Sequence, residues 1–335
     1  MPPVRLLVAT GSAVTRNRLI KALSEHPGVS VIGSAVDLSE TYTLAEAMEP
    51  QVILVAQEYM AQPEWDCMRS LFYALNARWV GILPTPPAAP QRGPTEPPTL
   101  HTGMTAAQLV AAIEQARSVR RTAPAAPPAV AAPGLRLRRD RLVLIGASTG
   151  GVDALLSVLS GFPPDCPPTA VVQHTGRNFT ESLIRLLDRR CKATVLPARS
   201  GLILKPGTIC VAAGSEGHLR LSAGESIRCM VTPGPAVSGH MPSVDELFRS
   251  ALPVASRVVA AVLTGMGRDG AAGLLDLRRA GATTLAQDEG SSVVYGMPGG
   301  AWDMGAVQQR LPLARIGVEI LRACAQMSEG SSVTR

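Results

Sequence analysis

The segment from Thr122 to Gly134, reading T-A-P-A-A-P-P-A-V-A-A-P-G, is the feature that most constrains how this chain folds. Its prolines lack the backbone N–H that helices and strands use, and its small side chains can bury little surface in a core. We therefore predict a semi-extended Pro/Ala/Arg linker over residues 121–139. A chain of 335 residues leaves room for a domain on each side, over residues 1–120 and 140–328.

Both halves alternate short apolar runs, typical of buried strands, with amphipathic stretches, typical of helices. The predicted strands are Arg5 to Val8, Ser30 to Ser34, Val52 to Val55, Trp79 to Leu83, Leu142 to Ile145, Ala170 to His174, Val258 to Leu263 and Thr283 to Ala286. The predicted helices are Val14 to Glu25, Ser39 to Met48, Thr105 to Arg120, Val152 to Leu159, Phe179 to Asp188, Val244 to Leu252, Ala271 to Ala280 and Leu313 to Gln326. This alternation predicts an α/β fold with a parallel sheet in each half. We expect an irregular loop at Pro84 to Pro98 and a β-hairpin insertion at Gly207 to Val231.

Composition excludes several classes of protein. No apolar run approaches the roughly 20 residues of a membrane span, and Val4 to Ala9 lacks the basic region of a secretory signal, so we expect a cytoplasmic protein without membrane insertion. Six widely spaced cysteines without a C-x-x-C pair argue against a zinc site and a disulfide framework. The arginines around the linker have no interleaved aromatics, which favours a solvated hinge over a nucleic-acid surface and is compatible with an acidic protein partner.

The string G-A-S-T-G-G at residues 146–151 directly follows the apolar run that ends at Ile145. A buried strand that ends in a small-residue turn and opens into a helix lifts one hydroxyl, here that of Ser148, beside free backbone N–H groups. The string alone leaves three interpretations open: a nucleophile, a phosphate-binding loop and a plain tight turn. A dinucleotide fingerprint needs glycine in place of Ser148 and an acid near the end of the following strand, where Gln173 and His174 stand.

Ser148, His174 and Asp269 end three predicted strands of the second half. Because reactive groups gather outside the carboxyl ends of parallel strands, His174 is the best candidate for the base that serves Ser148. Asp269 fits an acid that holds the His174 tautomer, and it also fits the N-cap of the next helix. The backbone N–H groups of Thr149 and Met266 are candidate donors to an oxyanion. The order Ser, His, Asp differs from the Ser, Asp, His of α/β-hydrolases and disfavours that family.

The chain has five histidines, so four others could be considered as the base in place of His174. His26 and His101 lie on the other side of the linker, and His218 falls in the predicted hairpin. His240 lies in a loop flanked by glycine and proline, so neither it nor His218 gives a comparable reason for assignment as the base.

The second half resembles the catalytic domain of the chemotaxis protein-glutamate methylesterases, the CheB family. The motifs that carry the resemblance over about residues 140–325 are G-A-S-T-G-G at 146–151, Q-H at 173–174, F-T at 179–180, G-P-A-V at 234–237, P-S-V-D at 242–245, L-T-G-M-G-R-D-G-A-A-G at 263–273 and Y-G-M-P at 295–298. The resemblance implies a doubly wound, Rossmann-like α/β fold with Ser148 as nucleophile, His174 as base and Asp269 as orienting acid, and it implies no metal and no cofactor. It further implies hydrolysis of glutamate methyl esters on methyl-accepting chemotaxis receptors, with release of methanol, and in many members deamidation of receptor glutamines.

Two positions depart from the family pattern. Met241 stands where the family has a basic residue before P-S-V-D, and Thr175-Gly176-Arg177 stands where Met-Pro is usual. We expect these positions to line the substrate groove and to affect the choice of receptor or the rate.

The first half resembles the receiver domain that such enzymes carry, without its phosphorylation chemistry. A receiver needs an acidic pair after strand one, an acceptor aspartate after strand three and a lysine after strand five. Here residues 9–12 read A-T-G-S, the acceptor position is Ala56, and Lys21 is the only lysine of this half. Because Mg²⁺ needs clustered carboxylates, and Glu58 and Asp37 are better explained as surface acids, we predict a pseudo-receiver with no phosphoacceptor.

Two hypotheses of different class follow. The first is a cytoplasmic serine esterase in chemosensory adaptation, whose first domain is a docking or autoinhibitory module independent of phosphorylation. The second is a scaffold or binding module that interacts with receptors and other proteins of a chemosensory array. Release of methanol discriminates the two.

Overall fold

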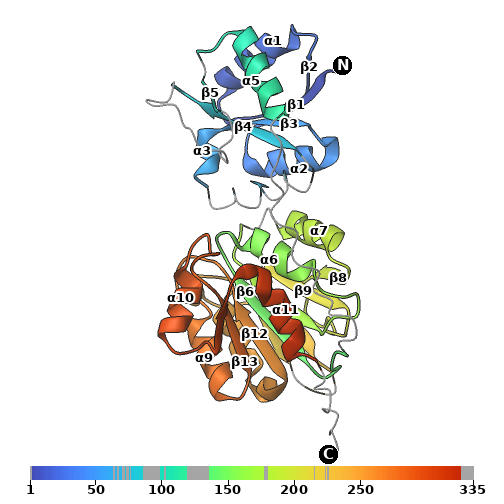
Figure 1. Ribbon diagram of the computed structural model, residues 1–335, viewed down its shortest axis with the longest axis vertical. Coiled ribbons are helices and arrows are strands. Elements are labelled where there is room, and N and C mark those ends of the chain that lie inside the picture. The colour runs from blue at the N-terminus through green and yellow to red at the C-terminus, as the bar shows by residue number, and fades with distance from the viewer. Residues whose placement is uncertain are drawn as a thin grey trace, which may run out of the picture. The chain divides into compact units, whose positions relative to one another are not determined.

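The structure is a computed structural model that describes residues 2–62, 65, 68–69, 72, 75, 77–85, 99–101, 103–118, 136–176, 180–214, 216–222, 224 and 226–325. The chain divides into two compact units, Met1–Ala123 and Pro124–Arg335 (Figure 1). Most of the predicted linker over 121–139 and of the predicted loop from Pro84 to Pro98 lies outside the described residues. Arg177, Phe179 and Gln326, which the sequence analysis named, also lie outside them.

The first unit is built on a five-stranded parallel sheet in the order β2-β1-β3-β4-β5. Its elements are β1 Val4–Ala9, α1 Ala13–Ser24, β2 Val29–Ala35, α2 Leu38–Met48, β3 Val52–Ala56, α3 Gln57–Met60, β4 Arg78–Leu83, β5 Thr99–His101 and α5 Ala106–Ser118. The order 2-1-3-4-5 is the flavodoxin-like order of doubly wound folds. Leu6 and Leu54 of the sheet share a core with Leu23 of α1 and Ile113 of α5.

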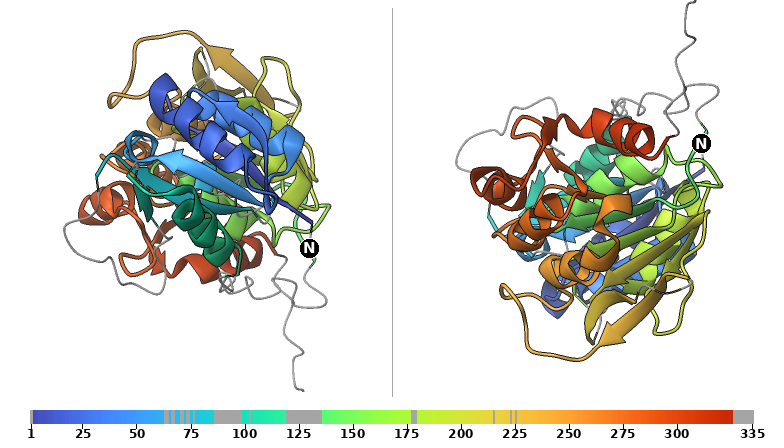
Figure 2. Two further views of the ribbon diagram at one scale, coloured as in Figure 1. Left: turned by 90° about the horizontal axis from the view of Figure 1, so that it is seen from above. Right: turned by 90° about the horizontal axis from the view of Figure 1, so that it is seen from below.

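The second unit is built on a seven-stranded parallel sheet in the order β14-β13-β12-β6-β7-β9-β8. Its elements are β6 Leu142–Ala147, α6 Gly151–Leu159, β7 Thr169–Gln173, α7 Thr180–Arg190, β8 Thr194–Pro197, β9 Thr208–Ala213, β10 His218–Ser222, β11 Arg228–Thr232, α8 Val244–Ser250, a 3-10 helix Leu252–Arg257, β12 Val258–Val262, α9 Ala271–Arg279, β13 Thr283–Gln287, α10 Gly296–Asp303, β14 Gln309–Leu311 and α11 Leu313–Ala323. Helix α6 contacts α7 and α11, whereas α9 contacts α8 and α10, so the helices form two layers on the sheet (Figure 2). Both predicted parallel sheets are therefore confirmed as doubly wound α/β structures.

Strand β6 is the point at which the sheet changes direction. From β6 the chain passes to β7 on one side, and it later returns to β12 on the other side. The loops that follow β6 and β12 therefore leave the carboxyl edge of the sheet toward opposite faces. Open α/β sheets bind their ligands in the crevice at such a switch point.

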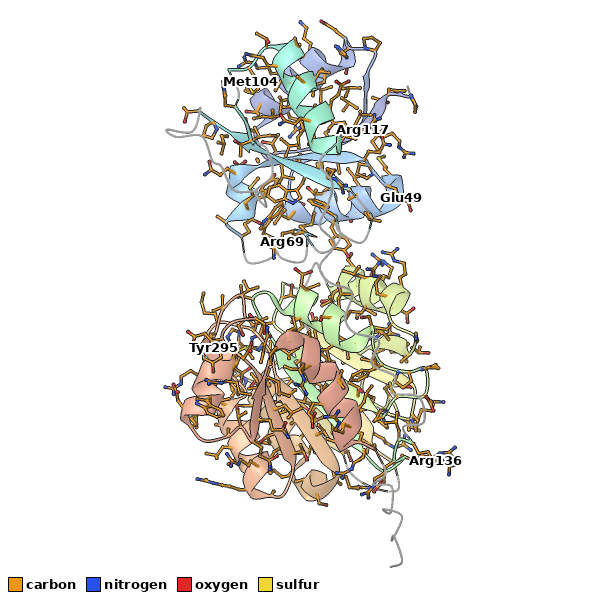
Figure 3. All side chains as sticks on the ribbon, in the orientation of Figure 1. Glu49, Arg69, Met104, Arg117, Arg136 and Tyr295 are labelled. Carbon is orange, nitrogen blue, oxygen red and sulfur yellow. The ribbon has the colours of Figure 1, made fainter. Side chains whose placement is uncertain are left out.

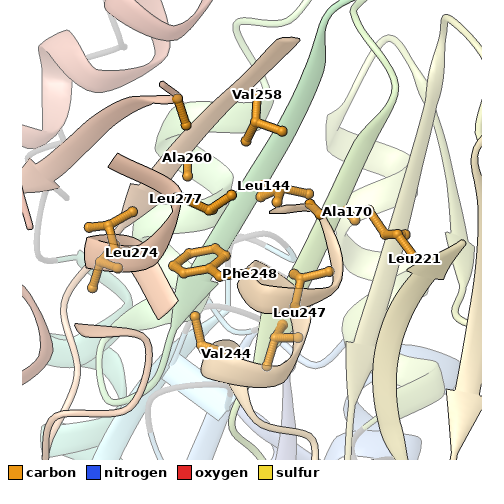
Figure 4. Close-up of a cluster of buried hydrophobic side chains, with 14 of the residues drawn as sticks. Leu144, Ala170, Leu221, Val244, Leu247, Phe248, Val258, Ala260, Leu274 and Leu277 are labelled. Atoms are coloured by element: carbon orange, nitrogen blue, oxygen red, sulfur yellow. The ribbon is translucent and has the colours of Figure 1, made fainter. Parts of the chain in front are cut away.

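The core of the second unit includes α8, which lies against the centre of the sheet. Phe248 and Leu247 of α8 are fully buried and belong to one cluster with Leu144 of β6 and Leu274 of α9 (Figure 4). This packing holds α8 against the sheet, so the first turn of α8 lies next to the carboxyl ends of β6 and β12.

The structure corrects several predicted elements. The Gly207 to Val231 segment is not one hairpin, because β9 is a parallel strand of the main sheet and only β10 and β11 pair as an antiparallel hairpin. Helix α8 ends at Ser250, before the 3-10 helix, and α11 ends at Ala323. The short strands β5, β8 and β14 were not predicted from the sequence. Helix α10 was not predicted either, because its glycines and proline are poor helix formers, although its residues 297–301 are buried.

Within the described part of the chain, no helix has the length and apolar character that a membrane span requires. The described residues also include no group of three or more His, Cys, Asp or Glu side chains arranged to hold a metal ion. Two of the free cysteines, Cys210 and Cys229, lie together in the core of the second unit, with their Sγ atoms 3.3 Å apart.

Candidate active site

Ser148 lies in the turn between β6 and α6, where the chain leaves the sheet. Gly150 caps α6 with a φ of 75°, a left-handed conformation that favours glycine. A Cβ atom on Gly151 would lie 2.2 Å from Oε1 of Gln173, so any larger residue there would displace the Gln173 side chain. These two glycines let the turn carry a half-buried serine directly above the end of β6.

The serine turn is fixed by hydrogen bonds from both neighbouring strands. The Ser148 N–H donates to the carbonyl of Thr264 at 3.0 Å, and the Thr264 hydroxyl donates to the carbonyl of Thr149 at 2.9 Å. On the other side, Nε2 of Gln173 donates to the Ser148 carbonyl at 2.8 Å. The turn is therefore held in place before any substrate binds.

Gly265 brings the loop that follows β12 against the serine. A Cβ atom on Gly265 would lie 2.6 Å from Cβ of Ser148 and 2.4 Å from Sδ of Met297. Its N–H donates to the carbonyl of Val294, and its carbonyl accepts from the N–H of Met297 at 2.8 Å. The loop before α10, marked by Tyr295 in Figure 3, thus supports the loop that contacts Ser148.

His174 follows β7, the strand next to β6. Gln173 pairs with Ala147 in the sheet register, and the His174 N–H donates to the Ala147 carbonyl at 3.0 Å, so Ser148 and His174 leave adjacent strands side by side. Nε2 of His174 lies 3.0 Å from Oδ2 of Asp269. The side chain of His174 is 7% exposed, and its Nδ1 is buried without a partner among the described residues.

Asp269 has no exposed surface and belongs to a network at the start of α8. Its carboxylate accepts from the Ser243 hydroxyl at 2.8 Å, from the Val244 N–H at 2.7 Å and from the Asp245 N–H at 3.1 Å. Burial acts to raise the pKa of Asp269, but the hydrogen bonds from His174, Val244 and Ser243 outweigh it and hold that pKa below its usual range. The carboxylate therefore stays ionised beside His174.

The interpretation of Asp269 as the N-cap of the following helix is wrong. Gly270 occupies the N-cap position of α9 with a φ of 89°. The carboxylate of Asp269 instead binds the amino end of α8, a helix that comes earlier in the chain. Because Asp269 is 24 or more residues away in sequence from the N–H groups that it binds, local sequence cannot reveal this contact.

His240 is a residue of this site that sequence reasoning set aside. Its ring stacks on that of His174, with centroids 3.8 Å apart and an interplanar angle of 7°. The only signal was its place two residues before the P-S-V-D string. Ser243 was also missed as a partner of Asp269, although it belongs to that string.

The two candidate oxyanion donors lie on the two loops that meet at Ser148. In the described part of the structure, the N–H groups of Thr149 and Met266 take part in no hydrogen bond. Met266 is 65% exposed and precedes Gly267, which has a φ of 82°. The structure thus joins His174 to Asp269 directly, while no hydrogen bond between the Ser148 hydroxyl and His174 occurs among the described residues.

The carboxyl edge of the first unit's sheet does not fit a Mg²⁺ ion. Thr10 and Ser12 follow β1, and Ala56 ends β3, so these strand ends carry no carboxylate. Arg16 donates to the carbonyl of Thr10 at 3.1 Å, which brings a cation to this edge. Asp37 is engaged as the N-cap of α2, where it accepts from the Glu40 N–H at 2.7 Å. A hard dication needs several oxygen ligands, preferably carboxylates, and would be repelled by the guanidinium.

These observations place the second unit in the class of doubly wound α/β proteins with a polar site at the switch point of a parallel sheet. The family model for the CheB methylesterase matches residues 143–320. The chain belongs to the CheB methylesterase family and is therefore a hydrolase.

Similarity extends beyond the second unit. A relative from Rhizobium etli, named protein-glutamate methylesterase/protein-glutamine glutaminase, is 38% identical over 349 aligned residues, which cover 98% of this chain and 99% of the relative. A relative from Caulobacter vibrioides, named protein-glutamate methylesterase/protein-glutamine glutaminase 1, is 39% identical, with coverage of 96% and 98%. The crystal structure of the Thermotoga maritima CheB methylesterase catalytic domain is similar with 32% identity and a TM-score of 0.53, and the match covers 54% of this chain and 97% of that domain.

Proposed function

We propose that this chain is a cytoplasmic serine esterase that removes methyl groups from glutamate methyl esters of methyl-accepting chemotaxis receptors. The observation that carries the proposal is the hydrogen bond between His174 and the buried Asp269, made at the strand end next to the Ser148 turn. The hydrogen bond assigns the N–H of His174 to Nε2, and it leaves Nδ1 as the nitrogen that accepts a proton.

In the first half of the reaction, Nδ1 of His174 takes the hydroxyl proton of Ser148 while Oγ attacks the ester carbonyl. The carbonyl oxygen becomes an oxyanion, which accepts hydrogen bonds from the N–H groups of Thr149 and Met266. Asp269 stabilises the imidazolium that forms. Collapse of the intermediate breaks the bond to methoxide, which leaves as methanol with the proton from His174.

In the second half, water attacks the acyl-enzyme and gives one proton to His174. The glutamate carboxyl group leaves, and the Ser148 oxygen recovers the proton. The same cycle on a receptor glutamine releases ammonia in place of methanol, so deamidation needs no further residue.

We further propose that the first unit, over residues 1–120, is a pseudo-receiver joined by the linker at 121–139 to the catalytic domain at 140–328. The absence of carboxylates after β1, Ala56 at the acceptor position and the contact of Arg16 with Thr10 support it. Its part in the enzyme is docking or inhibition independent of phosphate.

Release of methanol from a methylated receptor fragment, incubated with the purified full chain, tests the esterase. We expect methanol at the rate at which the fragment loses methyl groups, measured by gas chromatography and by mass spectrometry of the fragment. The alternative, a scaffold in a chemosensory array, predicts capture of the fragment with no methanol.

A further inference from the structure

The imidazole of His240 lies face to face with that of His174. The reaction described above gives His240 no task. We propose that His240 is a positioning residue for His174, which it holds by ring stacking in the orientation that pairs Nε2 with Asp269 and leaves Nδ1 available for a proton. The inference rests on the proposed role of His174 as the base.

A tight turn presents the His240 ring. Val237 and His240 exchange two backbone hydrogen bonds, of 3.0 Å and 2.9 Å, around Ser238 and Gly239. These two residues have positive φ values of 51° and 80°, as in a two-residue hairpin turn. The Ser238 hydroxyl also donates to Oδ2 of Asp245 at 3.3 Å, which anchors the turn to α8. The ring is therefore presented by fixed backbone.

The same loop is anchored at a second place, close to the network around Asp269. His218 is 2% exposed, its Nε2 donates to the carbonyl of Pro235 at 2.8 Å, and its Nδ1 accepts from the Ser243 N–H at 3.2 Å. Ser243 in turn donates to Asp269. His218 thus connects the loop that carries His240 to Ser243, and through Ser243 to Asp269, the partner of His174.

An imidazole needs a second constraint at this position. One hydrogen bond at Nε2 fixes a single atom of the His174 ring, and its Nδ1 has no partner within the described structure. A parallel ring at 3.8 Å blocks rotation of the imidazole about its bond to Cβ, because a turned ring would collide with the stacked one. Stacking therefore fixes the ring plane that the hydrogen bond leaves free.

The protonation state of His240 is compatible with stacking on His174. Burial, followed by the electrostatic interaction with His174, lowers the pKa of His240, and the interaction with Asp269 opposes this only in part. His174 and Asp269 are the titratable groups that act on His240, so its ring is neutral at neutral pH. A neutral ring does not repel the imidazolium that forms on His174, whereas a second positive charge at this distance would.

The test compares His240→Ala, which removes the ring, with His240→Phe, which keeps a flat ring without nitrogens. We measure kcat and KM for methyl ester hydrolysis by the full chain. Because small misplacement of a reacting group can cost about 10²-fold in rate, we expect His240→Ala to lower kcat by about 10- to 100-fold with KM unchanged. His240→Phe should retain most of the wild-type kcat. The control variant His26→Ala, in the first unit, should have the kcat and KM of the wild type.

A second readout needs no activity. In ¹⁵N NMR spectra at neutral pH, His174 should show a protonated Nε2 in the wild type and in His240→Phe, and a mixture of tautomers in His240→Ala. Thermal unfolding of each variant shows that it is folded.

The inference fails if His240→Ala keeps the wild-type kcat and tautomer, or if His240→Phe is as impaired as His240→Ala. The latter result would mean that a nitrogen of His240, and not its ring plane, is needed. Failure of the proposed function is distinct, since it would appear as an inactive wild type or an active Ser148→Ala, while the tautomer of His174 still tests the stacking.

Discussion

Asp269 combines complete burial with a full set of hydrogen-bond donors. A buried carboxylate is tolerated only when its oxygens are paired, and here the start of α8 supplies three donors before His174 adds the fourth. The carboxylate is therefore fixed by the fold, and His174 is oriented by a group that cannot itself turn. At the scale of single residues, the hydrogen bonds from Ser243, Val244 and Asp245 hold the Asp269 carboxylate in place before a substrate binds.

Replacing this carboxylate by an amide should damage activity strongly. In Asp269→Asn, one oxygen becomes an NH₂ group that faces donors, which favours the wrong tautomer of His174. We expect kcat to fall by about 10⁴-fold, as for serine hydrolases that lose the orienting acid. Stability at pH 7 should fall by about 1–3 kcal/mol, because buried donors lose their acceptor. Steady-state kinetics and urea unfolding measure the two effects, and a variant with wild-type kcat would contradict the assignment.

The lowered pKa of Asp269 also predicts a pH dependence of stability. Because the folded-state pKa lies below that of an unfolded aspartate, Asp269 adds stability above about pH 4 and loses that contribution as the pH falls through its folded-state value. We therefore expect the free energy of unfolding in urea to differ between the wild type and Asp269→Asn at pH 7, and this difference in free energy to shrink as the pH is lowered to 3. A difference that is constant with pH would contradict the prediction.

The residues at strand ends were accessible from sequence, whereas their supports were not. Ser148, His174 and Asp269 each follow an apolar run, so their meeting at one sheet edge follows from parallel pairing. His240 and Ser243 reach the site through a loop whose path is set by tertiary contacts, namely the turn at Ser238 and the buried ring of His218. No periodicity in the sequence encodes such contacts.

At the scale of elements, the site depends on the close approach of β6 and α8. Gly146 on β6 makes this possible, because a Cβ atom there would lie 2.3 Å from Cγ1 of Val244. Val244 is also the residue whose N–H binds Asp269, so this packing distance sets the position of the carboxylate. The long core strands were predictable from their apolar runs, whereas α10 was not, because burial in the fold overrides its glycines and proline.

Gly146→Ala should therefore destabilise the second unit. Insertion of one methyl group into a packed core typically costs about 1–3 kcal/mol, and we expect this loss in urea unfolding together with reduced activity. Gly290→Ala is the matched control, because no atom lies within 4 Å of a Cβ atom there, and its stability should change by less than about 0.5 kcal/mol. Equal stability of the two variants would refute the packing argument.

At the scale of the whole molecule, the chain joins a unit of the CheB methylesterase family to a first unit with the flavodoxin-like strand order 2-1-3-4-5, which we propose to be a pseudo-receiver. Relatives of the CheB family match over nearly the full length, so the first unit is part of the family architecture and not an unrelated addition. The parallel sheet of the first unit was predicted from its alternating apolar and amphipathic segments, whereas the order of its strands was not. The contact between Arg16 and the Thr10 carbonyl emerged only from the structure.

A small phosphodonor tests the pseudo-receiver. Incubation of the full chain with acetyl phosphate and Mg²⁺ should leave its intact mass and its esterase rate unchanged, because β3 ends in Ala56 and not in an aspartate. A mass increase of one phosphate that maps to residues 1–120 would overturn the proposal.

The role of Ser148 is tested by the rate of methanol release from a methylated receptor fragment, compared between the wild-type chain and Ser148→Ala. We expect steady release of methanol by the wild type and a rate at least about 10³-fold lower in the variant, with binding of the fragment retained. Ser148→Ala removes only one oxygen atom from a half-buried position, so its thermal unfolding should match that of the wild type. Equal release of methanol by the two proteins would contradict the central claim that Ser148 attacks the ester.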